Sequence, residues 1–252
     1  SDDLASEARR DFVARVATGD WDGIVMTRTA FQKLDVLVET ESAYLTREME
    51  SLREQLELAK GTGARKTVKQ IEKRLITGEE KLKAKLEVPR DPGLAFEQTG
   101  IDYVVVDEAH AYKNLATVSS IESVSISGSK RASDLDMKID YLRRRNGKRV
   151  VTFATATPIA NSVAEVHVMT RLLRPDLLEA AGVEHFDRWA ATFGKTVTEL
   201  EMAPAGGKYR EKTRFAQFQN VPEMLRMWHV FGDVKTAEDL NLPTPLLAAR
   251  ED

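Results

Sequence analysis

The sequence predicts an α/β protein in which a small parallel sheet carries an inserted antiparallel helical hairpin and a helical C-terminal appendage. Three observations lead to this prediction. Two short runs rich in β-branched residues, 101–106 and 150–154, each end in a polar loop. Apolar residues recur at helical spacing between residues 39 and 90. Helical patterns also dominate beyond Pro175, so residues 176–252 are expected to form the appendage.

Residues 1–38 are expected to form the first part of the sheet domain. A helix is predicted over residues 2–17 and ends at the turn sequence 18–20. The apolar run 24–26 then predicts the first of three short buried strands. One face of the predicted helix is apolar and carries Leu4, Ala8, Phe12 and Val16.

The segment 39–90 is predicted to form a coiled-coil-like helical hairpin. Its apolar seam continues from one arm to the other across a glycine-containing break. Residues 39–59 contain six acids and two bases, whereas residues 60–90 contain ten bases and four acids, so the arms should attract one another. We expect the hairpin to be able to move as a unit. It could bind DNA or a partner domain, or its two helices could only satisfy each other's apolar seam and charge. The predicted seam consists of Leu45, Met49, Leu52, Leu56, Ala59, Val68, Ile71, Leu75 and Leu82.

An acidic sequence, Asp107-Glu108-Ala109-His110, follows the strand predicted at 101–106. Open α/β sheets bind ligands at the carboxyl ends of their strands. Asp107 would hold Mg²⁺ through water, and Glu108 would polarise a water that attacks a γ-phosphate. The alternative is a surface turn with two solvated carboxylates.

A second hydroxyl-rich loop follows the strand predicted at 147–154. Thr155 and Thr157 precede Pro158, whose fixed φ suits the first turn of a helix. These hydroxyls can bond the acidic loop, although Thr157 as a simple helix cap is equally consistent with the pattern. The serine-rich stretch 119–133 between the two strands is expected to be mobile, and Ser133 or Asp134 would cap the helix that runs to Arg145.

Together these segments resemble the first RecA-like lobe (P-loop NTPase type) of Swi/Snf-type superfamily 2 helicases and ATPases. Residues 107–114 resemble motif II (the Walker B or DEAH box), 155–161 resemble motif III, and 22–31 are similar to motif Ib. Residues 91–175 would thus form the lobe with motifs II and III. The tail sequences 215–223 and 233–237 look like the helicase part of large helicase-methylase proteins of bacterial mobile elements and phages.

The resemblance implies roles for individual residues. Asp107, Glu108 and His110 would be catalytic, with Asp107 at the Mg²⁺ of a bound ATP, while Thr155 and Thr157 would couple hydrolysis to movement, with Asn161 supporting motif III. Ala156 stands where the family usually has glycine, which should matter little unless φ is positive there.

One family element is absent from the sequence. The phosphate loop G-x-x-x-x-G-K-[ST] does not occur, and the partial imitations at 60–67 and 206–209 lack a required glycine and a required hydroxyl. The chain is therefore expected to be a fragment of a DNA-dependent ATP hydrolase that is inactive by itself and uses ATP and Mg²⁺ only with the missing loop. The alternative is a non-catalytic DNA-binding or protein-interaction module built on the hairpin.

Composition limits the kinds of partner and compartment that the chain is expected to have. The chain has a net charge of −3, no cysteine and four histidines without metal-ligand spacing, and no signal peptide or long apolar span. We therefore expect a cytoplasmic protein without membrane contact. The basic residues Arg143, Arg144, Arg145 and Lys148 could contact DNA phosphates or only complement a helix dipole.

The resemblance also implies macromolecular partners. Duplex DNA is expected more than single strands, together with the rest of the parent chain, including a second RecA-like lobe and possibly a methylase domain. In the appendage, residues 242–245 are expected to form a linker toward that lobe. Five aromatic residues are predicted to anchor the appendage: Trp189, Phe193, Phe215, Phe218 and Trp228.

Overall fold

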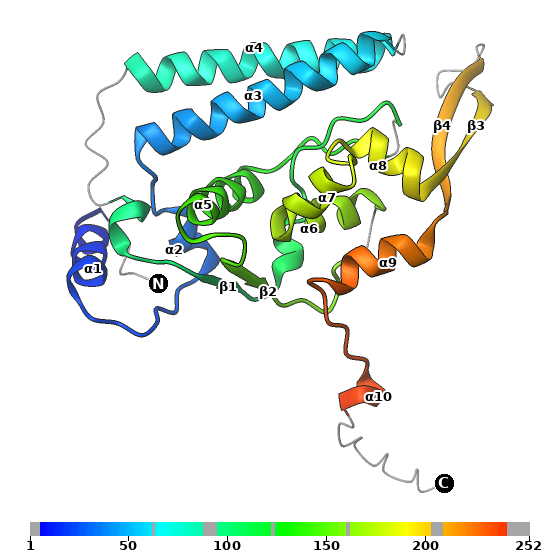
Figure 1. The fold of residues 1–252 in the computed structure, drawn as a ribbon. Coiled ribbons are helices and arrows are strands. Elements are labelled where there is room, and N and C mark those ends of the chain that lie inside the picture. Colours follow the sequence, from blue (N-terminus) through cyan, green and yellow to red (C-terminus); the bar gives the residue numbers. More distant parts are fainter. Residues whose placement is uncertain are drawn as a thin grey trace, which may run out of the picture.

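The computed structural model describes residues 6–61, 64–87, 95–121, 124–159, 162–202 and 209–240. It is a mixed α/β structure in which helices outnumber strands (Figure 1). The elements are α1 Ser6–Thr18, α2 Arg28–Gln32, α3 Val38–Gly61, α4 Arg65–Glu87, η1 Phe96–Thr99, β1 Val104–Val106, η2 Ala109–Tyr112, α5 Lys130–Asn146, β2 Val151–Phe153, α6 Ala164–Leu173, α7 Pro175–Ala180, α8 Phe186–Phe193, β3 Gly194–Met202, β4 Tyr209–Phe218, α9 Val221–His229 and α10 Ala237–Leu240.

The parallel sheet has two strands within the described residues, not the three predicted. β1 and β2 pair in parallel with Val105 opposite Thr152, and α5 forms the crossover between them. Residues 24–26 are not a strand, and the side chain of Val25 is fully exposed. A strand is stable only when its backbone groups are paired, and in the described part of the chain this run has no neighbouring strand.

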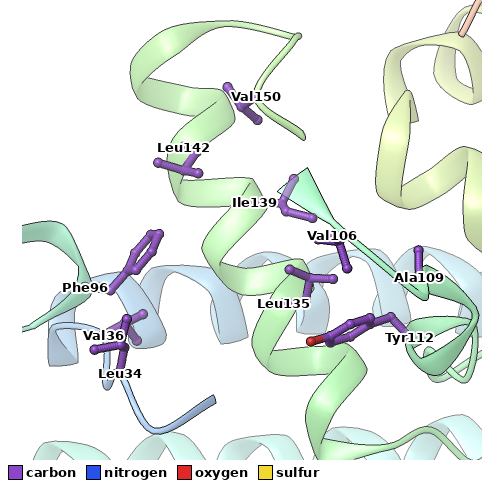
Figure 2. Close-up of a cluster of buried hydrophobic side chains, with 10 residues drawn as sticks. All are labelled: Leu34, Val36, Phe96, Val106, Ala109, Tyr112, Leu135, Ile139, Leu142 and Val150. Atoms are coloured by element: carbon purple, nitrogen blue, oxygen red, sulfur yellow. The ribbon is translucent and has the colours of Figure 1, made fainter. Parts of the chain in front are cut away.

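The core of the sheet domain lies on one side of the sheet, under α5. Leu135, Ile139 and Leu142 of this helix pack against Val106 and Val150 of the strand segments (Figure 2). The opposite side of the sheet is open, since Val105 is 71% exposed. The prediction that these strands are buried is therefore wrong for the side that carries Val105.

The segment before α5 is packed more closely than its serine content suggested. Ser119 is buried and its hydroxyl donates to Asp187 Oδ1 at 2.6 Å. Ser129, not Ser133 or Asp134, caps α5, because its Oγ accepts a hydrogen bond from the backbone N–H of Ala132 at 3.2 Å. The helix thus begins one turn earlier than predicted, which brings Ala132 into the core.

α3 and α4 form the predicted antiparallel hairpin, which lies across α5 in Figure 1. The seam matches the prediction except that Leu45 lies outside it and Val118, from the loop after η2, packs into it. Two ion pairs join the arms: Lys85 to Glu41 at 2.6 Å and Arg53 to Glu79 at 3.2 Å.

A partly buried polar cluster fixes the hairpin to the helices beneath it. Tyr44 of α3 donates to Asp136 Oδ2 of α5 at 2.8 Å. Arg171 of α6 donates to the same oxygen at 3.2 Å and to Glu48 Oε1 of α3 at 2.6 Å. Burial opposes the charge of Arg171, but Glu48 and Asp136 offset this and hold its pKa above the ordinary value. Hydrogen bonds and ion pairs within this cluster therefore link α3, α5 and α6. These links argue against free movement of the hairpin as a unit.

The C-terminal appendage is only partly helical. α7, α8 and α9 appear where helices were predicted, but β3 and β4 form an antiparallel hairpin that was not. The sequence 194–202 contains the β-branched residues Thr196, Val197 and Thr198, and its last four residues, 199–202, alternate polar and apolar with the period of a strand. Gly194 joins α8 directly to β3, and a Cβ there would lie 1.9 Å from the ring of Phe215.

The aromatic anchors of the appendage lie where the sequence predicted them. Trp189 and Phe193 are buried in the core around α8, and Phe215, Phe218 and Trp228 pack against this core with partial exposure. His167 of α6 lies at the edge of the same aromatic group, with its ring centroid 5.9 Å from that of Trp189.

No helix in the described parts of the chain is long and apolar enough to span a bilayer.

The buried histidine predicts how stability depends on pH. Burial lowers the pKa of His167 from 6.5 to about 4, so the folded state keeps the imidazole neutral where the unfolded state binds a proton. The stability from this group is present above the unfolded pKa and is lost as the pH falls toward the folded value. Between pH 7 and pH 5 we expect a loss of about 2 kcal/mol from His167.

Urea unfolding of His167→Gln at both pH values should show a pH dependence weaker by about this amount. The exposed His229, replaced in the same way, is the matched control and should leave the dependence unchanged. Equal pH dependence in wild type and His167→Gln would contradict the expectation.

The cluster around Arg171 predicts a large effect on stability. Arg171→Met leaves the buried carboxylate of Asp136 without its cation, and we expect the free energy of unfolding to fall by about 3 kcal/mol. Arg144→Met removes one of the two cations at the partly exposed Asp140, which keeps its ion pair with Arg47, and should cost less than about 1 kcal/mol. Adding Asp136→Asn to Arg171→Met should recover part of the loss. Similar losses for Arg171→Met and Arg144→Met in urea titrations would show that the cluster contributes little.

Candidate functional site

The acidic loop begins where β1 ends. Asp107 and Glu108 follow Val106 directly, and both side chains are exposed. Asp107 Oδ1 accepts a hydrogen bond from the Glu108 backbone N–H at 2.8 Å, which orients the carboxylate. Glu108 has a left-handed backbone, with φ 52° and ψ 46°. Non-glycine residues avoid this region, so the loop stores strain of order 1 kcal/mol at this position.

The core beneath the loop holds this strained turn in place. Ala109 is fully buried, and its backbone N–H donates to the carbonyl of Ala154 at 3.0 Å. The Ala154 N–H in turn donates to the carbonyl of Val106 at 2.9 Å, which extends the pairing of the strands into both loops. Tyr112 is buried against α5 (Figure 2). The acidic loop and the threonine loop therefore leave the same edge of the sheet side by side.

His110 connects the two loops. Its Nδ1 lies 3.0 Å from Glu108 Oε2 and 3.3 Å from Thr155 Oγ1. Thr155 Oγ1 also accepts a hydrogen bond from the Thr157 backbone N–H at 3.1 Å. A proton on Nδ1 would be donated toward Glu108, whereas a neutral ring with its proton on Nε2 would accept from the Thr155 hydroxyl. The position of the ring proton thus decides whether Nδ1 bonds Glu108 or accepts from Thr155.

The threonine loop accepts alanine without strain. Glu108 and Asn220 are the non-glycine residues with positive φ in the described chain, so Ala156 is not among them. The expectation that alanine replaces glycine there at little cost is consistent with this backbone. Asn161, the predicted support of motif III, lies outside the described residues.

The donor atoms near Asp107 suit a metal ion that takes only one or two ligands from the protein and the others from water and substrate. No group of three or more His, Cys, Asp or Glu side chains in the described parts of the chain is arranged to hold a metal ion. Mg²⁺ in nucleotide sites is commonly held by one or two carboxylates together with substrate phosphates and water. One exposed carboxylate, whose second oxygen has no hydrogen bond to the part of the chain that the structure describes, fits that chemistry.

A buried ion pair behind the acidic loop was not found from the sequence. Lys113 Nζ lies 3.2 Å from Glu165 Oε1 and 3.3 Å from Oε2, and both residues are buried. This pair joins the end of the acidic loop to α6, the helix that follows the threonine loop. The signal in the sequence is one acid in the otherwise apolar first turn of that helix. A buried charge of this kind needs a partner, although the sequence alone cannot name it.

The predicted basic cluster is divided by the fold. Arg143 turns inward and donates to the carbonyl of Leu172 at 2.5 Å, and burial lowers its pKa. Arg144, Arg145 and Lys148 stay exposed, but they bond Asp140, the Tyr141 hydroxyl and Asp176 respectively. A phosphate would have to compete with these internal partners for each exposed cation.

The chain is similar to known proteins in sequence. The chain is 30% identical over 151 residues to the protein called Defense against restriction protein B of Escherichia phage P1. That match covers 58% of this chain and 7% of the phage protein, so the chain spans a small part of its relative. No solved structure matches the chain.

A family model described as a probable helicase domain matches residues 1–236. This match includes the acidic loop, the threonine loop and the helical hairpin. The chain therefore belongs to the probable helicase domain family.

Proposed function

We propose that the chain is part of an ATP-driven motor of the Swi/Snf type that moves along DNA, with duplex DNA as its track. The observation that carries the proposal is the contact between the two loops. Asp107 and Glu108 stand at the end of β1, and His110 links Glu108 to Thr155 at the end of β2. Membership of a helicase family supports the reading of this edge as a nucleotide site.

Asp107 is proposed to hold Mg²⁺ through a bound water. Its Oδ1 is already used by the Glu108 N–H, which leaves Oδ2 to accept from the water. The exposure of the loop leaves room for the phosphates of ATP as the remaining ligands. When bound, the metal neutralises the charge that develops on the phosphates.

Glu108 is proposed to accept the proton of the attacking water. The contact between Glu108 Oε2 and His110 Nδ1 restrains the carboxylate without removing its second oxygen. One carboxylate is thus available for the metal and the other for water.

His110, Thr155 and Thr157 are proposed to couple the acidic loop to the helix that follows, with Asn161 completing the threonine loop. Thr155 Oγ1 contacts both His110 Nδ1 and the Thr157 N–H. Glu108 and Thr155 compete for the same ring nitrogen of His110. A change in the contact between Glu108 and His110 during hydrolysis would therefore alter the contact between His110 and Thr155. The Lys113–Glu165 pair provides a second, buried connection to α6.

Further parts of the same polypeptide are proposed to complete the site. The sequence contains no phosphate loop, and one face of the two-stranded sheet is exposed at Val105 and Tyr103. Parallel sheets are normally covered on both faces, so additional strands and helices are expected there. A second RecA-like lobe and a methylase domain are the partners that the family resemblance suggests.

The role of Glu108 can be tested in the full-length protein. Glu108→Gln removes the proton acceptor but keeps the size of the side chain, so we expect ATP turnover to fall about 100-fold or more while ATP binding persists. Asp102→Asn, an exposed acid just before β1, is the matched control and should leave turnover unchanged. Steady-state phosphate release within about threefold of wild type for Glu108→Gln would contradict the proposed role.

Nucleotide binding by the 252-residue chain tests the proposal that the site is shared. Without a phosphate loop we expect Mg²⁺-ATP to bind with a Kd of about 1 mM or weaker, worth about 4 kcal/mol or less. Isothermal titration calorimetry measures this directly. A micromolar Kd would show that the chain contains its own phosphate-binding site.

A further inference from the structure

The outer surface of the helical hairpin carries a row of cations on α4. Arg65, Lys69 and Lys73 follow one another at steps of four residues, which places them on one face of the helix. All three residues are exposed, whereas Ile71 and Leu75 on the opposite side are buried in the hairpin seam. The row covers about 12 Å at about 1.5 Å of rise per residue. We call these three residues the basic row.

The acids of α3 do not neutralise the basic row. The sequence places six acids on α3 opposite the basic arm, but three of them pair with cations outside the row. Glu41 pairs with Lys85, Glu48 with Arg171 and Glu57 with Lys60. Within the described parts of the chain, the three side chains of the basic row form no ion pair.

Like charges at steps of four destabilise a helix, so an unbalanced row is unfavourable in isolation. Between Arg65 and Lys73 the exposed neighbours do not suggest a protein partner; the exposed apolar side chain of Ile76 lies beyond the row. From Arg65 to Lys73, every exposed position of α4 carries a charged or amide side chain. Protein interfaces depend on buried apolar or aromatic anchors, which this stretch lacks. A polyanion would offset the repulsion along the row.

We propose that the basic row is a contact surface for the phosphate backbone of duplex nucleic acid. At about 3.4 Å of axial length per phosphate of one strand, the row can face three or four consecutive phosphates. This inference rests on the proposed function, because a motor must grip its track through sequence-independent contacts. It assigns part of that grip to the hairpin rather than to the cluster at Arg143.

The hairpin holds the row in a fixed position relative to the acidic loop. Arg74, one residue beyond the row, donates to the carbonyl of Ile126 at 2.9 Å and ties α4 to the segment before α5. The cluster around Arg171 fixes α3 to α5 and α6. A phosphate contact at the row is therefore rigidly connected to the helix that follows the threonine loop.

The test compares two variants with equal changes of charge. The first replaces the basic row, as Arg65→Gln, Lys69→Gln and Lys73→Gln. The control replaces three exposed lysines outside the row, as Lys33→Gln, Lys81→Gln and Lys83→Gln. Glutamine keeps the helix propensity of lysine, and circular dichroism confirms that both variants fold. Binding to a fluorescent duplex of random sequence, about 20 base pairs long, is measured by anisotropy at several salt concentrations.

We expect the basic-row variant to bind at least about tenfold more weakly, with the slope of log affinity against log salt reduced by about two to three. The control should change little. Equal losses in both variants, unchanged binding in the first, or no binding by wild type would each overturn the inference. Poly-glutamate binding with the same dependence on the row would also overturn it, in favour of an acidic protein partner. None of these results decides the role of Glu108, which the turnover experiment tests separately.

Discussion

The packing of α5 against the two strands is the interaction on which the rest of the structure depends. Two parallel strands of three residues cannot hold their register alone. Leu135, Ile139 and Leu142 cover the side of the strands that faces the core (Figure 2). Each fully buried side chain of this kind contributes about 1.5–3 kcal/mol. Because β1 and β2 end in the acidic and threonine loops, this packing also sets the distance between the loops.

The polar side of α5 positions the neighbouring helices. Asp136 meets Tyr44 and Arg171, and Lys138 is fully buried, where it donates to the carbonyl of Phe31 at 2.7 Å and to Asp134 at 2.8 Å. Burial lowers the pKa of Lys138, and Asp134 opposes that change. Buried charges are unfavourable unless each finds its partners in one geometry. They therefore fix how the hairpin and the α2 segment sit on the helix, which apolar contacts alone would leave less defined.

The candidate site is built from these constraints at an exposed end of the sheet. Its carboxylates are exposed, its strained residue is Glu108, and its histidine bridges two loops that the sheet holds together. Lys113 and Glu165 support it from behind in a dry environment. A strained backbone and a bridging histidine at an exposed edge suit a site whose loops change their contacts when a ligand or another part of the protein binds.

The sequence by itself determined the elements whose signals are local. Helical periodicity located the hairpin, and the apolar runs located β1 and β2. The order of the acidic and threonine motifs brought Asp107, Glu108, His110 and Thr155 into one candidate site. Local signals also misled. Residues 24–26 have the composition of a strand but no partner strand in the described chain, and the β-branched residues of β3 lie between segments with helical patterns.

Only the tertiary structure decided the long-range pairings. It showed that Lys113 meets Glu165, that Arg171 gathers Asp136, Tyr44 and Glu48, and that Arg143 turns inward while the basic row on α4 stays free of ion pairs in the described chain. Charge composition predicts that the arms of the hairpin attract each other, but not which carboxylate each cation reaches. That choice depends on burial and on distances between residues far apart in the sequence, which no local pattern encodes.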